Sequence, residues 1–353
     1  MDYEIDFLPV GNGDSSGDAI AIRYGIDGNY KVIVIDGGTK ESGENLVSHI
    51  KQYYNTNYVD YVLNTHPDKD HASGLSIILE KLEVGKLYIH RPWEYADKLI
   101  DYFKDQRMTV ESLKRKLKEN FSASYALEEL AISKKISIEE PYEGVEIDCF
   151  RVISPKKDWY LNELIPDFNK TPDKKNIMED TVKMISKYIK YLFETLSYET
   201  LKEGGVTSAD NESSVILYTT FNDEKGYLFT GDAGIKALEK ATNYAEELGI
   251  NLTSNLNFIQ IPHHGSRRNV SPSILDKILG TKGQEANKTA YVSAGKNAKK
   301  HPRQVVINAF IRRGCKVSAT QGKTICYSFN MPYREGWSET SHLSFKKEVE
   351  EYE

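Results

Sequence analysis

Four side chains that bind metal ions well lie within six residues of one another: His66, Asp68, Asp70 and His71. Imidazole nitrogens together with carboxylate oxygens suit zinc, manganese or iron better than calcium, which prefers oxygen ligands alone. An acidic turn with two incidental histidines has the same local pattern. The pattern by itself therefore leaves both interpretations open, and residues later in the chain decide between them.

The segments around this run predict a loop between a strand and a helix. Residues 58–63 are rich in β-branched and aromatic side chains, which is typical of a strand. Residues 74–82 have Leu75, Ile78 and Leu82 at helical spacing. A loop in this position can turn several side chains toward one point.

Further candidate ligands follow other predicted strands. Asp232 stands in a Gly-Asp turn after a strand at 226–229, and His263 follows a strand at 257–261. The candidate set is His66, Asp68, Asp70, His71, Asp232 and His263. Three histidines and three aspartates exceed the needs of one tetrahedral ion and fit two ions that share a carboxylate. We therefore predict a centre for two divalent cations, with Asp232 as the shared carboxylate.

Composition sets wide limits on the class of protein. The chain has 353 residues, 39% hydrophobic and 28% charged, which is ordinary for one large or two smaller globular domains. The net charge of −6 gives no general attraction to nucleic acid or to an anionic membrane, so any such affinity must be local. Three widely spaced cysteines favour a reduced compartment. Without a recognisable signal peptide or a long apolar run, we expect a cytoplasmic location and no membrane partner.

One segment departs from the alternation of strands and helices. Residues 155–210 are rich in lysine and acidic residues, and 177–201 has the apolar periodicity of an amphipathic helix. We interpret this segment as an insertion that forms a lid or a dimer surface. The charged stretch 345–353 predicts an exposed helix or tail. The predicted organisation is a main domain over 1–335 that carries the insertion, followed by a tail over 336–353.

These motifs together resemble the metallo-β-lactamase superfamily, whose signature is HxHxDH, a lone histidine, a Gly-Asp and a last histidine. Here the first motif reads His66-x-Asp68-x-Asp70-His71, with aspartate at the second histidine position, while Asp232 and His263 match the Gly-Asp and the last histidine. More narrowly, the chain resembles the hydrolase branch of the ComEC/Rec2 competence proteins. The further counterparts are Val10-Gly11-Asn12-Gly13-Asp14, Ile35-Asp36-Gly37-Gly38, Thr230-Gly231-Asp232, Pro262-His263-His264-Gly265-Ser266, Gly295-Lys296-Asn297 and His301-Pro302.

The resemblance spans about residues 5–330 and implies an α/β fold, an αββα sandwich of two mixed sheets flanked by helices. It also implies a hydrolase that uses two divalent ions, zinc or manganese. Two departures stand out. No histidine occurs around 210–214, so water, substrate, or a carboxylate or amide from that segment would complete one metal position. Asp68 in place of a histidine makes the ligand set harder and favours manganese over an all-zinc pair.

In such a centre, two cations activate a water molecule and no serine or cysteine nucleophile is needed. We predict that Asp70 binds one metal and orients the attacking oxygen. His264 and His301 are candidates for holding substrate oxygens or protonating a leaving group. A purely structural role is an equal alternative for His264.

The substrate prediction rests on local charge. Arginines and lysines follow the two loops expected to border the metals: Arg267, Arg268, Lys296, Lys299, Lys300 and Arg303. A basic rim on an acidic protein fits a phosphoester, with DNA or RNA the first choice, and predicts substrate contacts from Ser266, Arg267, Lys296 and Asn297. The alternatives are a small-molecule phosphoesterase, similar to phosphorylcholine esterases, and a non-catalytic metal-binding module with closed coordination.

Overall fold

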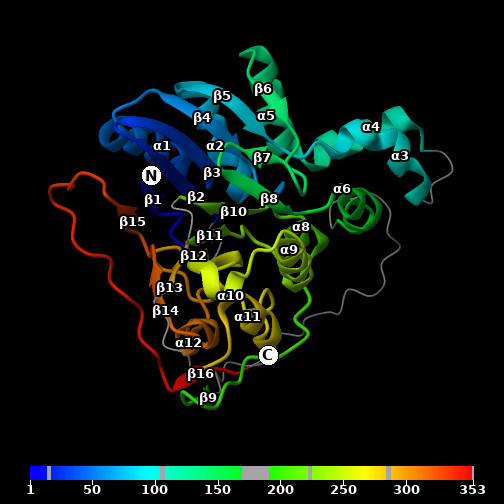
Figure 1. The fold of residues 1–353 in the computed structure, drawn as a ribbon. Helices are drawn as coiled ribbons and strands as arrows, with labels where there is room; N and C mark the ends of the chain where they lie inside the picture. The colour runs from blue at the N-terminus through cyan, green and yellow to red at the C-terminus, as the bar shows by residue number, and fades with distance from the viewer. Residues whose placement is uncertain (14–16, 104–107, 169–190, 222–224, 284–287, 352–353) are drawn as a thin grey trace.

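Two β-sheets pack face to face in the computed structural model, and helices cover both outer faces (Figure 1). The structure describes residues 1–13, 17–103, 108–168, 191–221, 225–283 and 288–351. The first sheet has the order β15-β1-β2-β3-β4-β5-β6 and the second has the order β14-β13-β12-β11-β10-β8-β7. This arrangement of two mixed sheets between helical layers confirms the predicted αββα sandwich.

The strands of the first sheet are β1 (Asp2–Phe7), β2 (Ala19–Ile26), β3 (Asn29–Gly37), β4 (Tyr58–Leu63), β5 (Glu83–Tyr88), β6 (Ser137–Glu139) and β15 (Ile325–Phe329). Those of the second are β7 (Glu146–Ile147), β8 (Phe150–Ser154), β10 (Ile216–Thr220), β11 (Gly226–Phe229), β12 (Leu256–Gln260), β13 (Lys288–Val292) and β14 (Cys315–Ala319). In the first sheet β3 to β6 are parallel and the other pairs are antiparallel. In the second sheet β11 to β14 are parallel and the other pairs are antiparallel. Parallel strands end at the same edge, so the loops after them can converge.

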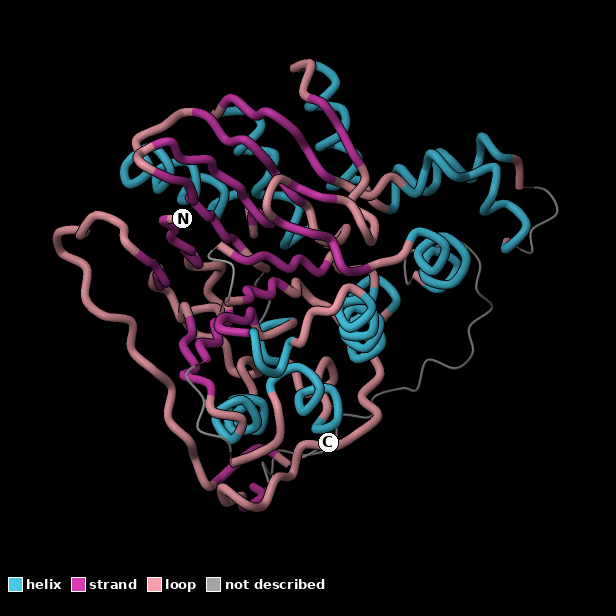
Figure 2. Tube along the Cα trace, viewed as in Figure 1, coloured by secondary structure: helices cyan, strands magenta, loops and turns pink. Residues whose placement is uncertain are grey.

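The main helices are α1 (Lys40–His49), α2 (Lys69–Lys81), α4 (Val110–Asn120), α5 (Ser122–Ser133), α9 (Ile235–Glu247), α11 (Pro272–Leu279) and α12 (Gln304–Arg312). Shorter ones are α3 (Ala96–Leu99), α6 (Lys157–Trp159), α7 (Ile165–Asp167), α8 (Ala209–Glu212) and α10 (Leu252–Asn255). Figure 2 shows helices on both sides of the pair of sheets. The predicted start of α11 is confirmed, since the Ser271 side chain accepts a hydrogen bond from the Ile274 amide as an N-cap.

The hydrophobic core has three layers. The middle one joins the inner faces of the sheets and is rich in aromatic side chains, such as Phe7, Phe258 and Tyr291. The second lies between the first sheet and helices such as α2, which contributes Leu75 and Ile78. The third lies beneath the helices on the second sheet. The sheets are therefore held against each other, and the position of one set of loops fixes that of the other.

Two predicted strand assignments change in the structure. Residues 145–153, predicted as one strand, form the antiparallel pair β7 and β8, with a turn in which Asp148 has a φ of 56°. The closing strands at 316–319 and 324–329 are present but lie at the edges of different sheets. The chain crosses between sheets at this point, and a local pattern does not show which sheet a strand joins.

The insertion and the tail also differ from expectation. Of the helix predicted over 177–201, residues 177–190 lie outside the described residues, whereas Tyr191–Phe193 form strand β9. This strand pairs antiparallel with β16 (Glu348–Glu350), which lies where an exposed helix or tail was expected. Val349 is fully buried there, so its apolar side chain decides the conformation of an otherwise charged segment. The predicted domain boundaries at 155–210 and 336–353 stay predictions.

Within the part of the chain that the structure describes, no helix combines the length and the apolar character needed to cross a bilayer.

Candidate metal centre

His66 lies in the loop between β4 and α2, His71 lies in the first turn of α2, and Asp36 at the end of β3 holds both. Asp36 Oδ1 accepts a hydrogen bond from the Thr65 amide (2.8 Å). Its Oδ2 accepts from Thr65 Oγ1 (2.5 Å) and from His71 Nδ1 (2.8 Å). The strand-to-helix loop was predicted, but α2 begins at Lys69, earlier than expected, so His71 lies in its first turn. Asp36 thus fixes both the loop and an imidazole.

The second sheet contributes the other half of the cluster. Asp232 follows Gly231, whose φ of 50° makes the turn after β11. His263 and His264 follow β12 with φ values of 45° and 55°, in the left-handed region that few non-glycine residues adopt. Adjacent side chains in an extended segment point in opposite directions. The left-handed backbone lets both imidazoles face Asp232.

The two halves meet at the Asp232 carboxylate. Its Oδ2 lies 3.4 Å from His71 Nε2 and 3.7 Å from Nε2 of both His66 and His263. Its Oδ1 lies 3.8 Å from His264 Nε2. Four imidazoles from two sheets therefore surround one carboxylate. His66, His71 and His263 are predicted ligands, whereas His264 was predicted to contact substrate or to protonate a leaving group.

Hydrogen bonds at the outer nitrogens fix the tautomers of three of these imidazoles. His264 Nδ1 lies 3.2 Å from the carbonyl oxygen of Ser293, which can only accept. His66 Nδ1 lies 3.0 Å from Thr65 Oγ1, whose own proton goes to Asp36. In each case Nδ1 must carry the proton and donate it. The neutral ring then turns the lone pair of Nε2 toward the cluster.

The same logic applies to His71, whereas His263 Nδ1 has two amide neighbours. His71 Nδ1 donates to Asp36. His263 Nδ1 lies 3.1 Å from Asn269 Oδ1, and the Asn269 amide nitrogen donates to the carbonyl oxygens of Asp232 and Ala233 (2.9 and 3.2 Å). These two bonds orient the Asn269 amide, so its oxygen faces His263. The Asn211 amide nitrogen also lies 2.9 Å from His263 Nδ1, so the hydrogen bonds fix the tautomers of His66, His71 and His264 alone. The Nε2 lone pairs of those three rings point at a carboxylate, an arrangement that a cation or added protons stabilise.

The electrostatics of the metal-free site agree with that conclusion. Burial by itself lowers the pKa of His71, but the carboxylates of Asp232 and Asp36 outweigh burial and raise it well above the ordinary value. Burial would raise the pKa of Asp232, but the surrounding imidazoles hold it well below its usual range. Burial lowers the pKa of His264 to about 3, so this ring is neutral. The site therefore attracts positive charge, which protons supply when no metal does.

The residues present fit a divalent cation. His66 Nε2, His71 Nε2 and Asp232 Oδ1 are buried and have no hydrogen-bond partner among the described residues. Ligand atoms of His71, Asp232 and His264 lie within 4.8 Å of one another. Those of Asp36, His66 and His71 do so too, but Asp36 already accepts hydrogen bonds from Thr65 and His71 and so orients these residues from outside the centre. Buried polar atoms in folded proteins nearly always have a hydrogen-bond partner. Several buried acceptors without such a partner, gathered at one point, therefore indicate a cation site.

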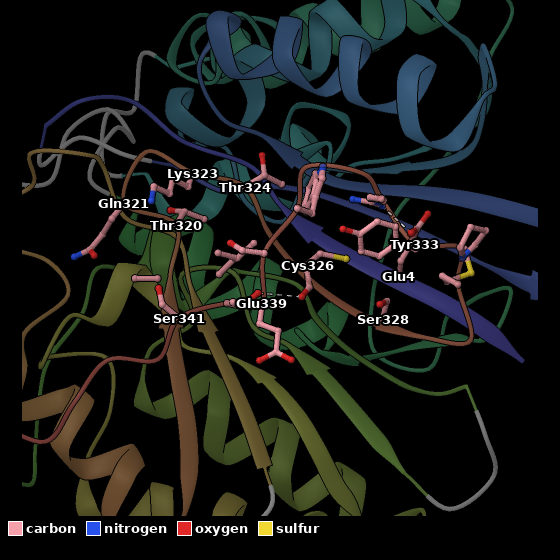
Figure 3. Close-up of a pocket in the computed structure, with 18 residues that line it drawn as sticks. Glu4, Thr320, Gln321, Lys323, Thr324, Cys326, Ser328, Tyr333, Glu339 and Ser341 are labelled. Atoms are coloured by element: carbon pink, nitrogen blue, oxygen red, sulfur yellow. Dashed lines mark hydrogen bonds and ion pairs between the residues drawn. The ribbon is translucent and has the colours of Figure 1, made fainter.

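A third cluster of possible ligands, two carboxylates and a thiol, does not fit a cation. Glu4, Asp6 and Cys326 also lie close together, beside a cavity of about 810 Å³ that Glu4 and Cys326 help to line (Figure 3). Here the carboxylates already have cationic partners. Asp6 accepts two hydrogen bonds from Arg334 (2.8 and 2.7 Å), and Glu4 pairs with Arg23 (2.6 Å). Because two arginines already neutralise its carboxylates, this group is an ion-pair network and not a candidate metal site.

Two predicted ligands lie at the edge of the cluster. Asp68 Oδ2 lies 3.7 Å from His66 Nε2, and the Asp68 side chain is 33% exposed. Asp70 lies in the first turn of α2 and belongs to neither group of converging ligand atoms found in the described residues. The Asp70 backbone oxygen lies so close to Gly17 that a Cβ on Gly17 would be only 1.5 Å from it. The structure therefore brings His66, His71 and His263 to Asp232 and places Asp68 beside His66, and the ligand role of Asp70 stays a prediction.

The predicted substrate-contacting residues lie on the loops after β12 and β13. His301 stacks near His263, with ring centroids 6.0 Å apart. Ser266 is buried, and Arg267 donates to the backbone oxygen of Glu351 (2.8 Å), so its guanidinium also holds the C-terminal strand. Lys296 and Asn297 are exposed.

Several residues around the cluster were not among the predicted site residues: Asp18, Asp36, Asn211, Gln260 and Asn269. Asp18 is buried, its Oδ2 lies 4.0 Å from His71 Nδ1, and burial raises its pKa to about 7. The Asn211 amide lies 2.9 Å from His263 Nδ1, in the segment that lacks the expected histidine. The glycines beside Asp18 and Asp36 signalled close backbone approaches, but no local signal marked Asn269 or Gln260.

Comparison with known families agrees with the topology. The model of the metallo-beta-lactamase superfamily matches residues 13–148, which include the loop carrying His66 and His71. Together with the two mixed sheets, this match supports the superfamily assignment made from the motifs. The narrower resemblance to the ComEC/Rec2 branch stays a prediction. No curated protein sequence matches the chain significantly.

Solved structures with some likeness include the hydrolase AbOPH of the beta-lactamase superfamily, with 12% identity, a TM-score of 0.32, and coverage of 68% of this chain and 71% of that one. A possible metal-dependent hydrolase from Veillonella parvula DSM 2008 has 10% identity, a TM-score of 0.37, and coverage of 92% and 98%. A long form RNase Z from yeast has 12% identity, a TM-score of 0.35, and coverage of 82% and 37%. Because these TM-scores are below 0.5, the fold assignment rests on the strand topology and the family match.

Proposed function

We propose that this protein is a metal-dependent hydrolase of phosphoesters, with a phosphodiester of DNA or RNA as the first candidate substrate. The observation that carries the proposal is the convergence of four imidazole Nε2 atoms on the buried Asp232 carboxylate. His66, His71, His263, His264 and Asp232 would hold the metal, with Asp68 at its open edge. This set exceeds one tetrahedral ion, which supports two divalent cations, zinc or manganese.

When bound there, divalent cations supply the water activation and the neutralisation of oxygen charge that phosphoester hydrolysis needs. The chain's own residues hold the geometry. Asp36 keeps the His71 ring oriented, and Asn269 does the same for His263. Outer partners of this kind fix ligand rings and raise their basicity. The neutral His264 fits a ligand role better than that of a proton donor, while the neighbouring His301 remains the candidate for protonating a leaving group.

Charge around the site supports the phosphoester class. Lys296, Lys299 and Lys300 are exposed on the loop after β13, and Arg268 is exposed after β12. On a protein with a net charge of −6, such a local group can attract a polyanion to this face. A phosphodiester backbone offers several charges in a row and so uses this rim better than a small neutral ester does.

The test is hydrolysis by the purified protein, loaded with Mn²⁺ or Zn²⁺, of single- and double-stranded DNA, RNA and bis-p-nitrophenyl phosphate. We expect metal-dependent cleavage that His71→Ala abolishes. Cleavage of bis-p-nitrophenyl phosphate without cleavage of any nucleic acid would favour the small-molecule phosphoesterase. No activity with either metal, or equal activity in His71→Ala, would contradict the proposal.

A further inference from the structure

One buried amide joins the two halves of the metal centre. Gln260, the last residue of β12, is 1% exposed. Its Oε1 accepts hydrogen bonds from the backbone amides of Thr230 (2.9 Å) and Gly231 (3.1 Å). Its Nε2 donates to Asp18 Oδ2 (2.8 Å). Every strong interaction of this side chain is therefore made with a residue next to the cluster.

The two ends of this amide reach different sheets. Thr230 and Gly231 form the turn that ends at Asp232, at the edge of the second sheet. Asp18 precedes β2 in the first sheet, and its Oδ2 lies 4.0 Å from His71 Nδ1. The Gln260 side chain thus spans from the Asp232 side of the centre to the His71 side.

The chemistry of the amide makes this link directional. The oxygen faces two N–H donors and the nitrogen faces a carboxylate, so a flipped amide would oppose like groups at both ends. A glutamate at this position would put two buried carboxylates together, and a leucine would remove the acceptor of two buried amides and the amide donor to Asp18. Both changes are costly in a dry interior, where unpaired polar groups are not compensated.

We propose that Gln260 is a positioning residue that sets the separation between His71 and Asp232, and through it the affinity and coordination geometry of the metal centre. The inference rests on the metal centre proposed above and adds to it a specific link between the sheets. Gln260 acts through Asp18 and through the Thr230–Gly231 turn, and it contacts no ligand atom of the centre itself.

The test uses Co²⁺, whose visible absorption spectrum reports coordination geometry. The metal-free full-length protein and Gln260→Leu are titrated with Co²⁺, and affinity and spectrum are recorded together. We expect Gln260→Leu to bind Co²⁺ about 10–100-fold more weakly, the loss typical of outer partners of metal ligands, with a changed spectrum. Equal affinity and an unchanged spectrum would overturn the inference.

A matched control separates positioning from a general loss of stability. Asn308 is also a fully buried amide, but its side chain holds the C-terminal segment through Glu194 (2.7 Å) and the Lys346 backbone oxygen (2.7 Å). Asn308→Leu should lower the melting temperature and leave the Co²⁺ affinity and spectrum unchanged. If Asn308→Leu shifts the spectrum as much as Gln260→Leu does, the effect is general and the inference fails.

A compensating pair keeps the test sharp even if Gln260→Leu does not fold. Gln260→Glu alone sets two carboxylates against each other and should weaken Co²⁺ binding. Adding Asp18→Asn reverses the direction of that hydrogen bond and should restore affinity to within about threefold of the native value. No restoration would overturn the inference. A native protein that binds no Co²⁺ would instead overturn the metal centre itself, so the two failures are distinct.

Discussion

His71 Nδ1 lies 2.8 Å from Asp36 Oδ2, so an imidazole in the first turn of α2 is held by the last residues of β3. The same carboxylate binds the amide and hydroxyl of Thr65. A single buried acid therefore fixes both the loop that carries His66 and the ring of His71. The centre depends on residues that would not themselves touch the metal.

Asp36→Asn should weaken metal binding about 10–100-fold, because the amide keeps the size of the side chain but cannot accept at both atoms. Calorimetric titration with Mn²⁺ or Zn²⁺ measures the change. Asp60→Asn is the matched control, since Asp60 Oδ2 also binds a backbone amide, that of Val32 (2.8 Å), on the neighbouring strand. Equal affinities for the two variants would argue against this role of Asp36.

Metal affinity should rise with pH. The neighbouring carboxylates raise the pKa of His71 despite its burial, so the metal-free site holds a proton that a cation must displace. Below that raised pKa, each displaced proton increases the apparent affinity about tenfold per pH unit. Titrations at pH 6, 7 and 8, in buffers with different ionisation enthalpies, give both the affinity and the number of protons released. A flat affinity with no proton release would contradict the expectation.

His90 should make the fold sensitive to acid. It is buried against Tyr160 (ring centroids 4.4 Å apart), and neither ring nitrogen has a hydrogen-bond partner among the described residues. Burial lowers its pKa to about 3, whereas the unfolded chain has a value of about 6.5. Between these values the unfolded state binds more protons, so the stability is complete above pH 6.5 and is lost as pH falls toward 3.

His90→Phe keeps an aromatic ring and removes the titration. We expect the native protein to lose about 1.4 kcal/mol more stability per pH unit near pH 4.5 than this variant does. Urea unfolding at several pH values gives both slopes. Parallel slopes would show that His90 does not titrate as its environment predicts.

Gly17 should tolerate no larger side chain. A Cβ at this position would lie 1.5 Å from the backbone oxygen of Asp70, whereas one at Gly13 would meet nothing within 4 Å. Gly17→Ala must push the glycine-rich loop off the start of α2, at a cost of about 1–3 kcal/mol. Gly13→Ala is the matched control and should be nearly neutral in the same unfolding experiment. Similar losses for both variants would contradict the packing argument.

Lys296→Ala should reduce binding of single-stranded DNA and lower the slope of log affinity against log salt concentration by about one. Hydrolysis of bis-p-nitrophenyl phosphate should be unchanged, because that small substrate does not reach along the rim. Lys51→Ala removes an exposed lysine from the helical layer and is the control. Fluorescence anisotropy over a range of salt concentrations measures the slopes, and equal slopes for both variants would count against the rim.

Local pattern was sufficient for much of the candidate site. The strand at Tyr58–Leu63 has the predicted bounds and the loop after it carries His66, whereas His71 lies in the first turn of α2 because that helix begins earlier than predicted. Asp232 and His263 were predicted at the ends of other strands because turn residues follow apolar runs there. These features depend on neighbours in sequence, so the residues alone determine them.

Other features depended on tertiary contacts. The aspartate that reaches the cluster from the glycine-rich loop is Asp18, whose position depends on Gln260 from the other sheet. His264 joins the cluster because the backbone after β12 is left-handed at two consecutive residues, a conformation that packing imposes against local preference.

The sequence by itself determined the donor types, their order and the strand ends that present them, because propensity and hydrophobic alternation act over a few residues. Only the tertiary structure decided which imidazoles surround one carboxylate and which outer partners orient their rings. Those properties come from contacts between two sheets, and no local pattern records the partner of a residue that is distant in sequence.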